Sequence, residues 1–592
     1  MIARPGPRKF AQRLCLTALA WIALGQPVRL SAAEKWFKVE TPDVHIYSNG
    51  SKGSVQEFAV HYLAFRHAFN ALLAPMGRRP DFATLLLFRD VETLRDYWAN
   101  TGQRSQTLAD FTVNVGDRDL FVLALPDHFD QPLAIALEND TQRMLRQVGY
   151  RLPIWMSQGA GEVLASLELH SGGYDIGDNQ ARFSETLVGP RIIPWDLFFV
   201  LSTGSDAYRG KNGNYPGLYQ AQAWAIMSAV LLHGSDSGER FRRLAGRVHG
   251  GIADGEAVAG VTGVKLKDMH QLVSLGSSAP NLHIPFDTAK VKASLLVAPA
   301  PDAEVKVQLA DLLAAMNNPR ESDRMLEAAV ALAPNAVYVK EAQGRRFLRR
   351  NDQQAATKVF REAIVAGSVD FQAYMTSALQ RLDDAQSSGH DVPGGGGNEI
   401  PEALAEIRRS LEFQPSAPRA YFQLGRALYV SSTVTDKDLE ELKPGIADPE
   451  NGSVVRLYRG MLYQRLGRIR EAQADLRWII ADHNATPALR AQATKFLRRT
   501  AFEADQAEAK KLVAAGKFQE AQAVVTQANL RVDGSTDVQA YADLKDWIAD
   551  NEVRAKALKC YQQKDWADLR DIATAYLAAN PAGGFAQSAH QL

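Results

Sequence analysis

The feature that most constrains the fold of this chain is a pattern of small and apolar residues that returns at a spacing of 34 residues. Ala310 occupies a small-residue position of one copy, and Gly344 occupies the corresponding position 34 residues later. A period of this length is typical of paired helices, with small residues where the two helices approach closely. Similar patterns recur at Tyr421, Leu424, Gly425 and Leu428, at Gly460, Tyr463, Leu466, Gly467, Ala472 and Leu476, and at Gly516, Phe518, Ala521, Val525 and Ala528. The second half is therefore predicted to be an all-α solenoid.

This pattern resembles the tetratricopeptide repeat (TPR), over about residues 302–583. Because solenoids bind along their concave side, the resemblance implies a protein or peptide partner. The composition changes after Pro299-Ala300-Pro301, which favours a linker at 286–301. A Gly-rich insertion is predicted near 388–398 and a tail at 584–592.

One predicted helix of the array carries four clustered arginines, which are Arg345, Arg346, Arg349 and Arg350. Two interpretations are open. The cluster is either a solvated helix face or a partner-binding patch for an acidic peptide.

The N-terminal segment 1–33 is typical of a secretory signal peptide. Basic residues precede an apolar run from Leu14 to Leu24, and Ser31-Ala32-Ala33 follows as a small-residue cleavage site. The alternative is an uncleaved anchor, but the apolar run is shorter than the roughly 20 residues that span a bilayer. We therefore expect an exported protein, periplasmic or extracellular, without a transmembrane span in the mature chain. The whole chain has 67 basic and 67 acidic residues, a balance that does not indicate a nucleic-acid partner.

Residues 34–285 alternate between strand and helix patterns. Strands are predicted at 36–39, 44–48 and 82–88, with a helix at about 55–73 and a hairpin formed by 111–113 and 120–125. Two further helices joined by a short turn are predicted within 138–162. The segment Pro153-Ile154-Trp155-Met156-Ser157-Gln158-Gly159-Ala160-Gly161-Glu162 resembles the Pro-x-Trp-x-x-Glu-Gly-x-Ala-Glu segment of gluzincin-type peptidase MA-like domains. The resemblance implies an α+β zincin-like N-terminal domain.

In that family a helix with His-Glu-x-x-His and a third ligand from the next helix hold zinc. On this pattern Asn139 and Arg143 take the places of the two histidines, Asp140 that of the general base, and Gln158 that of the ligand glutamate. Zinc hydrolysis needs three ligands with lone pairs, and a guanidinium offers donors only. The resemblance therefore implies a degenerate site with no metal, no cofactor and no catalytic residue.

The function that this pattern predicts is a non-catalytic exported scaffold in which a pseudo-metallopeptidase domain is coupled to TPR repeats. One alternative is an active zinc peptidase with atypical ligands. Another is a metal-free hydrolase that uses Asp140 and Glu162 for acid–base chemistry. The histidines are scattered, with none four residues from another, so they predict no second metal motif; His170 is expected on the surface, near Asp175.

Overall fold

The computed structural model describes residues 35–75, 78–95, 97, 110–115, 118–125, 131–177, 183, 192–201, 215–234, 236–389, 397–448, 451–482, 485–529 and 535–591. The predicted signal peptide at 1–33 and most of the Gly-rich insertion (390–396) lie outside these residues. The chain divides into two compact units, one made of 1–387 with 398–420 and the other of 388–397 with 421–592.

A six-stranded sheet organises the first unit, with the strand order β4-β5-β3-β2-β1-β9. Strands β2, β3 and β5 run parallel, whereas β4, β1 and β9 pair antiparallel with their neighbours. The predicted strands and the predicted hairpin (β4 with β5) are confirmed. The strands are β1 (Phe37–Glu40), β2 (Val44–Ser48), β3 (Ala83–Phe88), β4 (Asp110–Val115), β5 (Arg118–Ala124) and β9 (Val297–Pro299).

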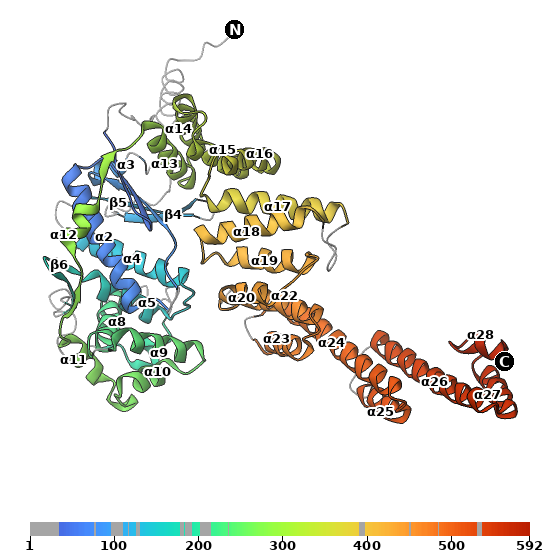
Figure 1. Cartoon of the computed structure of the whole chain (residues 1–592). Helices are drawn as coiled ribbons and strands as arrows, with labels where there is room; N and C mark the ends of the chain where they lie inside the picture. Colours follow the sequence, from blue (N-terminus) through green and yellow to red (C-terminus); the bar gives the residue numbers. More distant parts are fainter. Residues whose placement is uncertain are drawn as a thin grey trace, which may run out of the picture. The chain divides into compact units, whose positions relative to one another are not determined.

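One face of this sheet is covered by helices of the N-terminal region (Figure 1). Ile46, Leu85, Leu87 and Phe121 point from the strands into this core. The helices that contribute to it include α2 (Lys52–Leu72), α4 (Gln131–Gln147), α5 (Ile154–Ala165), α8 (Tyr215–Leu231), α9 (Ser237–His249), α10 (Asp254–Thr262) and α11 (His270–Ser277). The shorter helices of the region are α3 (Val91–Arg95), α7 (Trp195–Phe198) and the 3₁₀ turn η1 (Leu266–Asp268).

The opposite face of the sheet is covered by the first repeat helices. Leu86 and Phe88 of β3 share a core with Leu309, Leu312 and Leu313 of α13 (Asp302–Ala315). Every residue of β3 is therefore buried, since successive side chains enter different cores. The apolar run of β3 reflects a strand covered on both faces.

Polar contacts reinforce the attachment of α13 to the sheet. Glu304 of α13 is buried and accepts a hydrogen bond from the Tyr47 hydroxyl (2.6 Å), and it also pairs with Lys38 Nζ (2.5 Å). These contacts join β1 and β2 to the first repeat helix. The α+β region and the start of the helical array thus form one folded unit.

The prediction of a linker at 286–301 is wrong. The segment contains α12 (Thr288–Ser294) and β9, which pairs with β1 at the edge of the sheet. The side chain of Val297 is buried in the helix-covered core. Pro299 at the end of this short strand and Pro301 two residues later produce a linker-like composition. As a result, the unit boundary falls between 420 and 421 rather than in 286–301.

A small second sheet has the order β6-β7-β8 and joins two distant parts of the α+β region. Strand β6 follows directly after α5, whereas β8 lies shortly before α12. The strands are β6 (Glu168–His170), β7 (Gly173–Ile176) and β8 (Leu282–Pro285), and both pairings are antiparallel.

The remainder of the chain is a TPR-like array of helical hairpins. In the first unit, the pairs α13 with α14, α15 with α16, and α17 with α18 pack against each other. A methyl group at Gly344 would lie 2.4 Å from the Phe360 ring, so this position requires a residue without a side chain, as the repeat pattern predicts. The helices are α14 (Pro319–Leu332), α15 (Val337–Arg349), α16 (Gln353–Val365), α17 (Phe371–Ser387) and α18 (Glu399–Phe413). The boundary between the units falls within α19 (Pro418–Val430).

The second unit continues with the packed pairs α22 with α23, α24 with α25, and α26 with α27. The predicted tail 584–592 is wrong as well, because Phe585, Ala586 and Ala589 are buried against the preceding helix. No helix among the described residues has the length and apolarity to cross a membrane. The helices are α20 (Asp436–Glu441), α21 (Lys443–Ile446), α22 (Gly452–Arg465), α23 (Ile469–Ala481), α24 (Pro487–Ala514), α25 (Phe518–Asn529), α26 (Ser535–Gln563), α27 (Trp566–Ala579) and α28 (Ala586–Gln591).

Candidate functional site

The pair of helices predicted within 138–162 is present as α4 and α5. Gly149 follows the end of α4 with a φ of +89°, a conformation that favours glycine. The chain then turns, and α5 begins directly after Pro153. Helix α5 packs against α4 and α8.

Two glycines of α5 allow this close packing. A methyl group at Gly161 would lie 2.8 Å from Cγ of Glu138 on α4, and one at Gly159 would lie 2.3 Å from the carbonyl oxygen of Ala223 on α8. A side chain at either position would require backbone movement. The Gly159-Ala160-Gly161 segment is therefore explained by helix packing.

The candidate site is the buried group Tyr62, Asp140 and Arg143. Asp140 Oδ1 accepts a hydrogen bond from Arg143 Nε at 2.6 Å, and Asp140 Oδ2 accepts one from the Tyr62 hydroxyl at 2.7 Å. Arg143 Nη1 also lies 3.6 Å from Asp119 Oδ2 on β5. Tyr62 and Asp140 are fully buried, and Arg143 is 5% exposed. The guanidinium thus connects α4 to the sheet, and both oxygens of the Asp140 carboxylate are occupied.

The electrostatics of this group keep Arg143 charged and Tyr62 protonated. Burial alone would lower the pKa of Arg143, but the negative charge of Asp140 raises it above its ordinary value. Burial, together with the charge of Asp140, raises the pKa of Tyr62. Tyr62 therefore remains a hydrogen-bond donor, and Arg143 remains a cation that opposes a second cation nearby.

The other residues that the resemblance to peptidase MA-like domains singled out lie in different environments. Gln158 and Glu162 are buried on α5, whereas Asn139 is exposed on α4. Asp140 and Arg143 have the i, i+3 spacing at which opposite charges on a helix pair. This ion pair could therefore have been predicted from the sequence.

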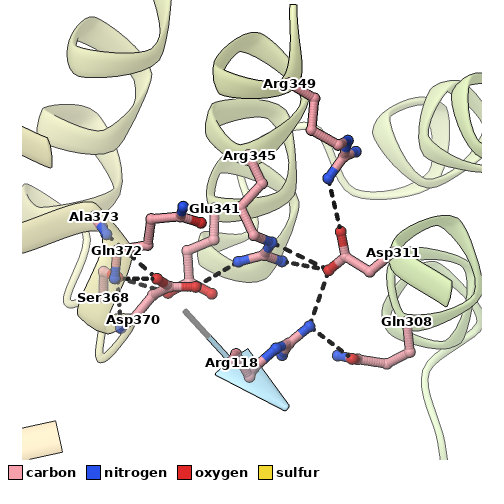
Figure 2. Close-up of polar contacts among 10 residues, drawn as sticks. All are labelled: Arg118, Gln308, Asp311, Glu341, Arg345, Arg349, Ser368, Asp370, Gln372 and Ala373. Carbon is pink, nitrogen blue, oxygen red and sulfur yellow. Dashed lines mark hydrogen bonds and ion pairs between the residues drawn. The ribbon is translucent and has the colours of Figure 1, made fainter. Parts of the chain in front are cut away.

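The predicted arginine patch divides into a buried and an exposed part. Arg345 is buried, and its guanidinium contacts the carboxylates of Asp311 and Asp370 (Figure 2). Asp311 also accepts a hydrogen bond from Arg118 of β5 at 2.9 Å, and Arg349 Nη1 lies 3.5 Å from it. The placement of Arg345 in an exposed patch is wrong, because its charge is neutralised inside the fold.

Arg346 and Arg350 lie nearer to the solvent, and both pair with Asp323 of α14. Arg346 also pairs with Glu327. A role in partner binding for these arginines stays a prediction.

A polar groove is formed by residues of α15, α16 and α17, and sequence reasoning missed it because its lining comes from three different helices. Its lining includes Lys358 and Arg361 together with Val365, an apolar side chain that is 89% exposed. The other lining residues are Lys340, Asp352, Gln353, Gln354, Ala355, Thr357, Glu362, Gln380 and Asp384.

The small sheet brings together a second group of polar side chains. His170, which is exposed as predicted, lies there with Asp175 next to His283 from β8. The separation of more than 100 residues between Asp175 and His283 explains why spacing in the sequence did not indicate this group.

Comparison with known proteins shows distant similarity only. No protein-family model and no curated protein matches the chain. The solved structure "Human IFIT1 dimer with m7Gppp-AAAA" is similar at 11% identity and a TM-score of 0.23, covering 61% of this chain and 73% of that chain. "Human IFIT1 dimer with PPP-AAAA" is similar at 12% identity and a TM-score of 0.19, covering 62% and 82%. Scores this low carry no argument about ligands, so the description of the helical array rests on its own hairpins.

Proposed function

We propose that this protein is a non-catalytic exported scaffold, in which a degenerate peptidase-like domain is joined to TPR-like repeats that bind a protein or peptide. The observation that carries the proposal is the buried Arg143–Asp140 pair. On the zincin-like alignment, a permanent cation takes the place of a metal ligand, and the carboxylate in the place of the general base is held by Arg143 and Tyr62.

The polar groove on α15, α16 and α17 supports a peptide as the partner. Charged and amide groups line it beside the exposed Val365, a combination that suits an extended peptide with polar backbone groups and one apolar anchor. The groove contains both signs of charge, as does the chain as a whole, which favours a peptide over a nucleic acid.

The test of catalysis uses the full chain with a mixed peptide library. We expect no cleavage by the natural protein and no effect of a chelator. Chelator-sensitive cleavage that Asp140→Asn abolishes would overturn the non-catalytic assignment in favour of a zinc peptidase. Cleavage that a chelator leaves unchanged, but that Glu162→Gln removes, would favour the metal-free hydrolase.

The test of binding selects peptides from a display library on the full chain and compares two matched variants. Val365→Asp places a charge in the groove and is expected to weaken binding of the selected peptides about tenfold or more. Val369→Asp is the control, because Val369 is also exposed (63%) but does not line the groove. Equal effects of the two variants, or selective binding of a short single-stranded RNA, would overturn the groove as a peptide site.

Export is tested separately by sequencing the N-terminus of the secreted or periplasmic protein. Cleavage after Ala33 is the expected result. Retention of the whole chain in the cytosol would contradict the proposal that the protein is exported.

A further inference from the structure

The small sheet β6-β7-β8 places two imidazoles and a carboxylate on one face. Asp175 is directly opposite His283 in the β7–β8 register, and His170 lies on β6 opposite Gly173. His283 Nδ1 is 2.7 Å from Asp175 Oδ1, and His170 Nε2 is 3.0 Å from Asp175 Oδ2. Each oxygen of one carboxylate therefore contacts a different imidazole.

Gly173 makes this arrangement possible. A methyl group at Gly173 would lie 2.8 Å from Cε1 and 3.1 Å from Nε2 of the His283 ring, so the ring occupies the space that a side chain would fill. As a result, the His283 ring extends toward His170, and the two rings stack with their centroids 6.2 Å apart.

From this geometry we infer a site for a divalent transition-metal ion of the zinc class, with His170, Asp175 and His283 as ligands. The potential ligand atoms of the three side chains all lie within 4.8 Å of one another. Ligand nitrogens around a tetrahedral zinc ion are about 3.3 Å apart, as their bond lengths dictate. The ligand atoms must therefore move somewhat closer together to contact one ion. Rotation of the side chains can provide this movement, because the His170 and His283 side chains are 40% and 55% exposed.

The donor set selects the kind of ion. Two imidazoles with one carboxylate suit zinc and related first-row ions, whereas magnesium and calcium require oxygen ligands. Three protein ligands leave one position for water or for a further donor. Glu168, an exposed carboxylate opposite Asp175 on β6, adds negative charge to the same row of the sheet.

The site is separate from the degenerate motif on α4 and α5, so the inference does not depend on the proposed function. A bound ion would connect β6, which follows α5, to β8, which precedes α12 and the edge strand β9. This link closes a loop of more than 100 residues, so the ion is expected to stabilise the α+β region when it binds.

The experiment titrates the full chain with Zn²⁺ and with Mg²⁺, and follows binding by calorimetry and the midpoint of thermal unfolding. We expect one Zn²⁺ per chain, a rise of the midpoint with Zn²⁺, and no response to Mg²⁺. The double variant His170→Ala/His283→Ala is expected to weaken Zn²⁺ binding more than about 100-fold. Asp175→Asn, which keeps the shape of the side chain, should weaken it as well.

The matched control is His249→Ala/His270→Ala, since both of these histidines are exposed and lie outside the small sheet. This variant should bind Zn²⁺ like the natural protein. Absence of Zn²⁺ binding by the natural chain would overturn the inference, as would binding that His170→Ala/His283→Ala leaves unchanged. Zn²⁺ binding that only Asp140→Asn abolishes would overturn both this site and the non-catalytic assignment. Zn²⁺ binding that His170→Ala/His283→Ala abolishes, in a protein that cleaves no peptide, supports this site and agrees with the non-catalytic assignment.

Discussion

The buried carboxylate of Asp311 is the contact whose removal should most weaken the attachment of the repeats to the sheet. It is 1% exposed and accepts two hydrogen bonds from Arg345 (3.1 and 2.8 Å) and one from Arg118 (2.9 Å). Asp311→Asn keeps the size of the side chain but removes the charge that compensates both guanidinium groups. Breaking a buried ion pair by removing one partner costs about 3–5 kcal/mol. Because Arg345 keeps its ion pair with Asp370, we expect Asp311→Asn to lower the local stability by an amount near the lower end of this range, about 3 kcal/mol.

The assay is hydrogen exchange of backbone amides followed by mass spectrometry. A loss of about 3 kcal/mol in local stability corresponds to roughly 100-fold faster exchange. The acceleration should be confined to peptides from β5, α13 and α15, with α27 in the other unit unchanged.

Asp323→Asn is the matched control. Asp323 also pairs with two arginines, Arg346 and Arg350, but its side chain is 28% exposed. Exposed pairs contribute about 0.2–1 kcal/mol, so exchange should accelerate by less than roughly sixfold. Equal acceleration in Asp311→Asn and Asp323→Asn would refute the argument that the buried network joins the repeats to the sheet.

The same network predicts a dependence on pH. Burial alone would raise the pKa of Asp311, but Arg345, Arg118 and Arg349 together hold it below its ordinary value. A lowered folded-state pKa contributes stability above the unfolded-state pKa of about 3.9, and this contribution is lost as the pH falls through the folded-state pKa. The difference in urea midpoint between the natural protein and Asp311→Asn should therefore shrink below about pH 4.

Three further predictions follow from the buried parts of the first unit. Arg143→Met leaves the Asp140 carboxylate buried beside Tyr62 alone and should lower the free energy of unfolding by about 3–5 kcal/mol; an unchanged urea midpoint would contradict this. A fragment of residues 34–301 exposes the sheet face that α13 covers and should bind a hydrophobic dye and aggregate, whereas a fragment of 34–420 should remain monomeric in size-exclusion chromatography. Burial lowers the pKa of His61 to about 4. Between about pH 6.5 and pH 4, His61 is therefore protonated in the unfolded chain but neutral in the folded protein. Stability should fall by up to about 3 kcal/mol between pH 6.5 and 4, and His61→Gln should reduce this loss in acid unfolding curves.

Local patterns predicted most of the elements of the α+β region. The alternation in β1 and β2 and the turn between β4 and β5 are short-range signals, and the structure contains all four strands. The continuous apolar run of β3 indicates a strand in an apolar environment, but it does not identify what covers each face. The repeat helices that cover the second face begin more than 200 residues later in the chain.

The ion-pair partners of the arginine cluster could not be predicted from the spacing of the arginines, because the partners lie far away in the sequence. The four arginines lie on one helix, and their spacing alone leaves open whether they face solvent or the interior. Asp311 and Arg345 are separated by 34 residues, one repeat period, so corresponding positions of consecutive repeats carry opposite charges. Comparing the repeats position by position would have indicated this pair, whereas Arg118 comes from the sheet and gives no such signal.

Taken by itself, the sequence determined the paired helices of the repeat array and the two consecutive helices α4 and α5, the first of which carries Asp140 and Arg143. These follow from residue type and spacing along the chain, which act over a few turns of helix. Only the tertiary structure decided that 286–301 supplies an edge strand, that Arg345 is buried, and that His170 and Asp175 meet His283. The physical reason is that burial and electrostatic pairing depend on distance in space, and folding brings together residues that lie tens to hundreds of positions apart.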